Sequence, residues 1–215
     1  MTADTTSGPA ARLVVLASGR GSNLQALIDA CAAGALAAKV VGVWSHTASA
    51  LALERARRAG IPATFIAPPS KRADADTRAG WERELAERIA HAEPDLIVLA
   101  GWMRILGPEL IARFTDAAGR TRIVNLHPAL PGELPGMDAI VEAFAEAEDG
   151  KRRESGVMVH VVVPEVDAGP VLAVERVPID VAAGLDAFEA AMHAAEHRLL
   201  VAAVRDYLAR LGTPA

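Results

Sequence analysis

The fold is decided by residues 13–23, whose sequence is Leu13-Val14-Val15-Leu16-Ala17-Ser18-Gly19-Arg20-Gly21-Ser22-Asn23. The first five residues are apolar, a pattern typical of a strand buried on both faces of a parallel sheet. A glycine- and serine-rich turn follows. Apolar residues then recur with helical spacing as far as Gly34, a residue type that favours a helix C-terminus. The stretch therefore predicts a strand, a tight turn and a helix, the first unit of a parallel α/β sheet.

The alternation of strand and helix continues along the chain. Apolar periodicity predicts strands over residues 13–17, 40–44, 63–66 and 96–100, and helices over 23–33, 49–59 and 77–91. In the second half it predicts strands over 122–126, 156–163 and 171–177, and helices over 137–147 and 185–211. The connection at residues 164–170 is too short for a crossover helix, so the strands beside it are expected to pair antiparallel. We therefore expect an α/β, Rossmann-like fold: a doubly wound, mostly parallel sheet with an antiparallel C-terminal strand pair.

The composition is that of a globular protein with no general attraction for polyanions. With 215 residues, 52% of them hydrophobic, the chain can bury a full core. We expect a single domain over residues 11–215 after a disordered start at residues 1–10. The net charge of −5 argues against nucleic-acid and membrane partners. The single cysteine, Cys31, cannot form an internal disulfide, and no apolar run is long enough to span a bilayer, which favours a cytoplasmic protein.

The glycine-rich turn favours a phosphate ligand over a dinucleotide. Its glycines let the backbone approach an anion, and the first amides of the following helix point towards it. A dinucleotide fingerprint needs a third glycine, where Leu24 stands. It also needs an acidic residue near the end of the second strand, where the chain has Trp44, Ser45 and His46. The turn thus predicts a phosphomonoester site, with a tight turn that binds no ligand as the alternative.

Asn125 and His127 are polar residues at the end of a predicted buried strand. Because residues at i and i+2 of a strand point to one face, both can project over the carboxyl edge of the sheet, where open α/β sheets bind ligands. Asp167 lies in the turn between the last two strands. An amide, an imidazole and a carboxylate together can stabilise an oxyanion and move protons in acyl transfer. The alternative is a set of polar side chains satisfied by loop backbone.

The chain lacks the usual sequence patterns of covalent and of metal-dependent catalysis. No serine or cysteine occupies a recognisable nucleophile elbow, so we expect direct attack by a nucleophile of the substrate. His193 and His197 are spaced i, i+4 but lack the glutamate of a zinc-protease helix. No metal is therefore expected.

Four short motifs in this order resemble the phosphoribosylglycinamide formyltransferases of purine biosynthesis. They are Ser18-Gly19-Arg20-Gly21-Ser22-Asn23-Leu24-Gln25, Ala100-Gly101-Trp102-Met103-Arg104-Ile105-Leu106, Asn125-Leu126-His127-Pro128 and Val166-Asp167-Ala168-Gly169-Pro170. The resemblance runs from about Arg12 to Leu208. It implies a transferase that moves the formyl group of its co-substrate, 10-formyltetrahydrofolate, to the amine of glycinamide ribonucleotide. It also implies that the reaction uses neither a metal nor a covalent enzyme intermediate.

The resemblance implies a role for each motif. Asn125 would hold the formyl oxygen, His127 would act as an acid and hydrogen-bond donor, and Asp167 would orient His127 and help to move the amine proton. The phosphoribosyl substrate would be bound by the turn and by the last helix, at Gly21, Ser22, Asn23, His193 and Glu196. The folate would be bound by a wall after the fourth strand, by the catalytic amide and by a basic residue at its glutamate tail, that is by Met103, Arg104, Ile105, Leu106, Asn125 and Arg78.

Three residues depart from the pattern of the family around the substrate. Glu133 stands where a basic residue is common, Asp138 stands near an expected histidine, and Met158 replaces a polar residue. These changes concern the substrate pocket and leave the three catalytic positions intact.

Other function classes are the alternatives to this interpretation. Methionyl-tRNA formyltransferases normally carry an additional C-terminal domain and a basic surface, and formyltetrahydrofolate hydrolases usually carry an N-terminal regulatory domain. We expect neither feature in this acidic chain. A nucleotide-binding module, such as an NAD(P)-dependent reductase, would depend on the glycine turn alone. The sequence is compatible with a homodimer.

Overall fold

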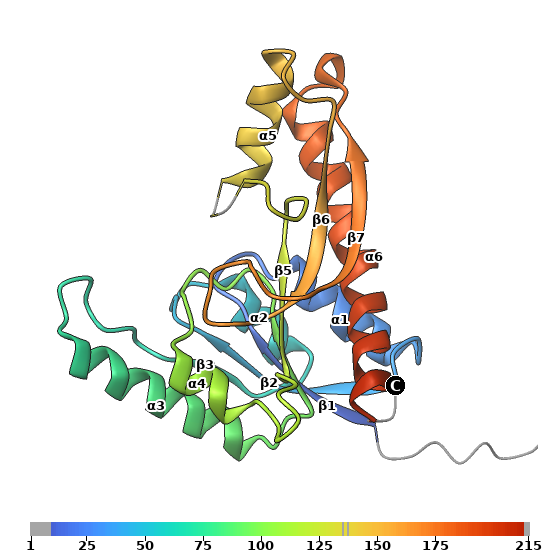
Figure 1. Ribbon diagram of the computed structural model, residues 1–215. Coiled ribbons are helices and arrows are strands. Elements are labelled where there is room, and N and C mark those ends of the chain that lie inside the picture. The colour runs from blue at the N-terminus through green and yellow to red at the C-terminus, as the bar shows by residue number, and fades with distance from the viewer. Residues whose placement is uncertain (1–9, 135, 137, 213–215) are drawn as a thin grey trace, which may run out of the picture.

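The computed structural model describes residues 10–134, 136 and 138–212, and these residues form one seven-stranded sheet with helices on both faces (Figure 1). The strands are β1 (Ala11–Leu16), β2 (Ala38–Ser45), β3 (Ala63–Phe65), β4 (Leu96–Leu99), β5 (Ile123–His127), β6 (Glu154–Val161) and β7 (Val171–Pro178). The helices are α1 (Ser22–Ala32), α2 (Leu51–Arg58), α3 (Ala75–His91), α4 (Pro108–Arg113), α5 (Ala139–Glu148) and α6 (Leu185–Leu211), with a 3-10 turn, η1, at Val181–Ala183.

The strand order of the sheet is β3-β2-β1-β4-β5-β6-β7. The first five strands run parallel, whereas β6 is antiparallel to β5 and β7 is antiparallel to β6. The predicted doubly wound, mostly parallel sheet with an antiparallel C-terminal pair is confirmed, and the antiparallel pairing extends to the β5–β6 boundary. The order reverses between β1 and β4, and open α/β sheets bind ligands at such a switch point.

Strand β1 separates the two faces of the core. Leu13 and Val15 pack in the cluster that includes residues of α1, α2, α5 and α6. Val14 and Leu16 pack in the cluster formed with α3 and α4. All four side chains are fully buried, which explains why the strand has an unbroken apolar run instead of an alternating one. Each buried leucine or valine contributes roughly 1.5–3 kcal/mol by leaving water.

Helix α6 spans the height of the sheet and contacts β6, β7 and α1 (Figure 1). Its buried residues recur every three or four positions, as expected of a helix with one apolar stripe; they are Phe188, Met192, Ala195, Glu196, Leu200, Ala203, Val204, Tyr207 and Leu208. One of them, Glu196, is charged. The carboxylate of Glu196 is therefore buried next to the start of α1.

The structure differs from the sequence prediction in a few elements. The predicted strands and helices are all present, with ends shifted by a few residues, but α4 and η1 were not predicted. Helix α4 has only six residues and begins with Pro108, so its apolar pattern is too short to be recognised. The predicted disordered start covers residues 1–10, of which 1–9 lie outside the described residues, and so does residue 137, the predicted first residue of α5.

Candidate active site

Asn125 and His127 lie at the carboxyl end of β5, beside the carboxyl end of β4. In the sheet, Asn125 pairs with Leu99 of β4 on one side and with His160 of β6 on the other. His127, two residues further along β5, pairs with Met158. The side chains of Asn125 and His127 therefore share the edge of the sheet next to the β1–β4 switch point.

Asn125 is held by two polar neighbours. Its Nδ2 donates to His160 Nε2 over 3.1 Å and to Asp167 Oδ1 over 3.3 Å. His160 Nδ1 lies 3.0 Å from the carbonyl oxygen of Val161, and because a carbonyl only accepts, this nitrogen carries the hydrogen. In the neutral ring, Nε2 is then the acceptor, which assigns the NH₂ end of the Asn125 amide to the side of His160 and Asp167.

His127 lies between two acceptors. Its Nδ1 is 3.7 Å from Asp167 Oδ2, and its Nε2 donates to the carbonyl oxygen of Leu134 over 3.1 Å. The side chain is only 6% exposed, so few water molecules reach it. A ring with an acceptor on each side can carry a second proton or donate a hydrogen bond, as general acid catalysis requires.

Asp167 contacts both groups from a strained loop position. Its φ of 52° lies in the left-handed region, which asparagine and aspartate tolerate better than most residues. Gly169, two residues later, approaches the carbonyl group of Val161 so closely that no side chain would fit. The loop is thereby pressed against β6. The sequence prediction that Asn125, His127 and Asp167 come together is thus met by the geometry of the described residues, and we call these three residues the acyl-transfer group.

A cavity of about 310 Å³ opens beside the acyl-transfer group. Its lining includes all four residues predicted as the folate wall, Met103, Arg104, Ile105 and Leu106. Met103 and Ile105 are exposed, so apolar surface faces solvent beside the cavity. Arg104 stacks over the ring of Trp81 at 5.0 Å, which fixes the base of this wall.

Arg78, the residue predicted for the glutamate tail of the folate, lies elsewhere. It belongs to α3, does not line the cavity, and donates from Nη2 to the carbonyl oxygen of Lys71 over 3.1 Å. Its predicted role stays a prediction.

The glycine turn forms a second polar site on the same edge of the sheet. Gly21 is the N-cap residue of α1, with φ 72° and no side chain to cap the helix, so the amides of the first turn are left for another acceptor. A Cβ atom at Gly21 would lie 2.7 Å from Ala52 Cα of α2, so glycine is required here both by conformation and by space. Ser22 and Asn23 are the first two residues of the helix.

Helix α6 brings two further predicted residues to this turn. Glu196 Oε2 accepts from Asn23 Nδ2 over 3.0 Å and lies 3.0 Å from His193 Nδ1. The hydrogen bond to Glu196 raises the pKa of His193 above its ordinary value, despite partial burial, which opposes the change. Asn23 Oδ1 is buried without a hydrogen-bond partner among the residues that the structure describes. The five predicted phosphoribosyl-binding residues are therefore gathered at one place.

The two sites are linked through residues to which the sequence analysis gave no role. Ser18 donates from its backbone N–H to the carbonyl oxygen of Gly101 over 2.9 Å, so the glycine turn touches the loop that begins the folate wall. Ser18 Oγ also contacts His46 Nδ1 at 2.8 Å, and His46 meets the ring of Trp102 edge-on at 4.6 Å. His160 was overlooked as well, because a histidine within the apolar run of β6 looks like an ordinary core residue.

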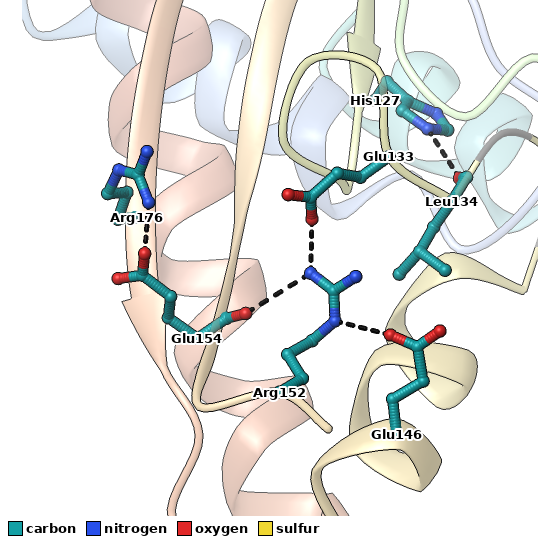
Figure 2. Close-up of polar contacts among 7 residues, drawn as sticks. All are labelled: His127, Glu133, Leu134, Glu146, Arg152, Glu154 and Arg176. Carbon is teal, nitrogen blue, oxygen red and sulfur yellow. Dashed lines mark hydrogen bonds and ion pairs between the residues drawn. The ribbon is translucent and has the colours of Figure 1, made fainter. Parts of the chain in front are cut away.

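The three residues that depart from the family pattern have different surroundings. Met158 is buried opposite His127, and Asp138 is the N-cap residue of α5 but makes no capping hydrogen bond with its side chain. Glu133 forms an ion pair with Arg152 (Figure 2). Glu133 therefore meets a basic residue within this chain.

Metal sites and membrane spans were also sought. Within residues 10–134, 136 and 138–212, no group of three His, Cys, Asp or Glu side chains is arranged to hold a metal ion. No helix in this part of the chain is long and apolar enough to cross a membrane.

Comparison with known proteins agrees with this geometry. Residues 11–204 match the formyl transferase family. The chain is 46% identical over 204 residues to the phosphoribosylglycinamide formyltransferase of Schizosaccharomyces pombe, covering 92% of this chain and 97% of that protein. It is 41% identical over 198 residues to the enzyme of the same name from Dictyostelium discoideum, covering 90% and 96%.

Among solved structures, glycinamide ribonucleotide transformylase 1 from Symbiobacterium toebii superimposes with a TM-score of 0.81 at 34% identity. The match covers 94% of this chain and 90% of that one. The fold and these similarities confirm the resemblance noted in the sequence. The chain belongs to the formyl transferase family, and within it to the phosphoribosylglycinamide formyltransferases.

Proposed function

We propose that the protein transfers the formyl group of 10-formyltetrahydrofolate to the amine of glycinamide ribonucleotide. The products are formylglycinamide ribonucleotide and tetrahydrofolate, a step of purine biosynthesis. The observation that best supports this reaction is the acyl-transfer group beside the cavity, where the Asp167 carboxylate lies 3.3 Å from the Asn125 amide and 3.7 Å from the His127 imidazole. Family membership supports the same chemistry.

The amide of Asn125 is suited to stabilise the oxyanion. When the amine nitrogen attacks the formyl carbon, the formyl oxygen gains negative charge and needs a donor already in position. Asn125 Nδ2 is held towards His160 by the shorter of its two contacts, so the longer one, to Asp167, is the contact that the formyl oxygen would replace. The amide then donates to the substrate without turning.

His127 and Asp167 are suited to move the proton. The C–N bond to the amine forms with loss of one amine proton, and the bond from the formyl carbon to N10 breaks as N10 gains a proton. Asp167 would accept the amine proton, and His127, whose Nδ1 faces that carboxylate, would donate to the oxyanion or to N10. The proton taken up by Asp167 would then pass to His127 Nδ1 across the contact between them, so the proton lost by the amine replaces the one given to N10 and the site ends the cycle unchanged.

The two substrates would approach from different sides of the switch point. The phosphate of glycinamide ribonucleotide would accept from the backbone amides at Gly21, Ser22 and Asn23, with His193 adding positive charge. Glu196 would accept from ribose hydroxyls. The pterin of the folate would lie against the wall of Met103, Arg104, Ile105 and Leu106 and reach the acyl-transfer group.

A product assay distinguishes the proposal from its alternatives. Purified protein with both substrates is expected to yield formylglycinamide ribonucleotide and tetrahydrofolate in equal amounts. Release of formate without glycinamide ribonucleotide at a comparable rate would instead indicate a hydrolase. Tight binding of NAD(P) without folate binding would indicate a reductase.

Cellular location and assembly are proposed from composition. The lone cysteine and the acidic composition support a cytoplasmic enzyme whose partners are small molecules. A homodimer is the assembly we propose to test, by sedimentation at assay concentration.

A further inference from the structure

The turn between β5 and α5 contains a strained residue that contacts His127. Leu134 has a φ of 41°, a conformation that residues with a side chain rarely adopt. Its carbonyl oxygen accepts the hydrogen bond from His127 Nε2. Strained backbone persists only where its surroundings hold it. The orientation of the His127 ring therefore depends on what holds this turn.

Arg152 connects Glu133 of this turn to helix α5 and strand β6 (Figure 2). Its Nη1 pairs with Oε2 of Glu133, the residue before Leu134 in the chain. The same nitrogen donates to the carbonyl oxygen of Glu154 over 3.4 Å. Its Nε pairs with Glu146 Oε2 at 2.8 Å. A single guanidinium thus joins the turn, helix α5 and the start of strand β6, using the planar donor geometry that lysine does not have.

Burial of the guanidinium distinguishes this contact from an ordinary surface ion pair, although the side chains of Glu133 and Glu146 are 39% and 40% exposed. The Arg152 side chain is only 16% exposed, whereas Arg176, which pairs with Glu154 on the outer strands, is 64% exposed. Exposed pairs contribute little because solvent screens them and long side chains move freely. Glu133 as the main hydrogen-bond partner, with Glu146 as a second, raises the pKa of Arg152 above its ordinary value, so the cation is permanent.

The other contacts made by the described residues of the turn are local or apolar. The backbone N–H of Glu133 donates to the carbonyl oxygen of Leu130 over 3.0 Å, within the turn itself. The Leu134 side chain is partly buried against the core. Neither contact joins the turn to α5 or β6 by a polar interaction. The ion pair therefore restricts the rotation of the Leu134 carbonyl more than these contacts do.

We propose that Arg152 is a positioning residue for formyl transfer: through Glu133 it holds the Leu134 carbonyl against His127 Nε2 and so keeps His127 Nδ1 facing Asp167. The inference rests on the proposed function, since it concerns the same acyl-transfer group. The proposal also assigns a role to Glu133, which stands where a basic residue is common in the family. A basic side chain there could not pair with Arg152, so this way of holding the turn depends on the Glu133–Arg152 combination.

Kinetics of matched variants test the proposal. Arg152→Gln and Glu133→Gln are each expected to lower kcat about 10-fold, with the KM of both substrates changed by less than about 2-fold, because misplacement of a catalytic group slows chemistry without removing a binding contact. The double variant should lose little more than Arg152→Gln alone, since both substitutions remove the Glu133–Arg152 pair. Arg152→Lys should recover part of the rate. Arg176→Gln, which breaks an exposed pair of the same type, is the control and should leave kcat unchanged.

Nitrogen-15 NMR of the His127 ring gives a readout that does not depend on turnover. The wild-type protein should show a hydrogen fixed on Nε2 and protected from exchange, and Arg152→Gln and Glu133→Gln should lose that protection while Arg176→Gln keeps it. If Arg152→Gln fails to fold, Glu133→Gln and Arg152→Lys decide the matter. Unchanged kcat and an unchanged His127 spectrum in these variants would overturn the proposal. A wild-type protein without formyl transfer would refute the proposed function, and the NMR result would still decide the role of Arg152.

Discussion

Asn125 and His160 face each other across the antiparallel boundary between β5 and β6, with 3.1 Å between Asn125 Nδ2 and His160 Nε2. The pairing of the two strands thus orients the side-chain amide of Asn125, the proposed oxyanion donor. Because His160 Nδ1 is fixed by the carbonyl of Val161, the acceptor nitrogen always faces Asn125. The sheet itself therefore sets the direction in which the amide donates.

Replacing His160 with leucine should lower kcat. The variant removes the acceptor that holds Asn125 Nδ2, and misorientation of a transition-state donor by about 1 Å costs up to ~100-fold in rate. We expect a loss of about 10- to 100-fold in steady-state formyl transfer, with thermal unfolding measured alongside. His91→Leu, at an exposed histidine of α3, serves as the control. A His160→Leu enzyme with wild-type kcat would show that Asn125 needs no such support.

The affinity for the phosphorylated substrate should decline as the pH rises. The pKa of His193 is raised by Glu196, so the imidazolium is present below the ordinary histidine pKa and is lost as the pH passes the raised value. The KM for glycinamide ribonucleotide should increase across that range. In His193→Gln it should be roughly 3- to 10-fold higher at low pH, the effect of one partly exposed charged donor, and should lose this component of the pH dependence. An identical pH profile in the variant would contradict a role for His193.

Gly21→Ala should damage both folding and phosphate binding. Alanine at a φ of 72° is strained, and its Cβ would meet Ala52 of α2. Gly34→Ala is a matched control, because Gly34 has a φ of 71° but open space around the added atom. We expect Gly21→Ala to lower the free energy of unfolding by at least about 1 kcal/mol more than the control, measured in urea. We also expect its KM for the phosphorylated substrate to rise. Equal behaviour of the two variants would rule out a special role for the turn.

Cys31 should be unreactive in the folded enzyme. Burial raises the pKa of its thiol to about 11, so the thiolate is scarce at neutral pH. Modification by an aromatic disulfide at pH 7.5 should be roughly 100-fold slower than in urea, where the pKa returns to its ordinary range. Cys31→Ala should keep full activity. Rapid modification of the native protein that abolishes turnover would require a different reading of this residue.

Much of the fold was predictable because local pattern and tertiary environment agree. The apolar runs of β1 and β4 are buried on both faces, and glycine marks helix ends at Gly34 and Gly60 with positive φ. Helix α4 escaped prediction because its six residues hold too little periodicity. The antiparallel pairing of β6 with β5 escaped it because the direction of a strand depends on distant packing, which no local pattern encodes.

The residues of the candidate site were predictable where polar residues stand at the end of an apolar strand. Asn125 and His127 could be inferred to share a surface because both end the same buried strand, whereas the place of Asp167 beside them was implied by the family resemblance. His160 could not, since its burial in β6 is equally consistent with a core histidine satisfied by backbone. The Glu133–Arg152 pair could not be predicted either. Arg152 lies in a charged segment after α5, and such segments are usually exposed to solvent.

The central claim is that Asn125, His127 and Asp167 carry out formyl transfer. The most direct measurement is kcat for formylglycinamide ribonucleotide formation by the wild-type protein, Asn125→Ala and Asp167→Asn under saturating substrates. We expect turnover by the wild type and a loss of at least ~100-fold in each variant, the scale of removing an oxyanion donor or a tuned proton acceptor. Wild-type turnover in both variants would contradict the account.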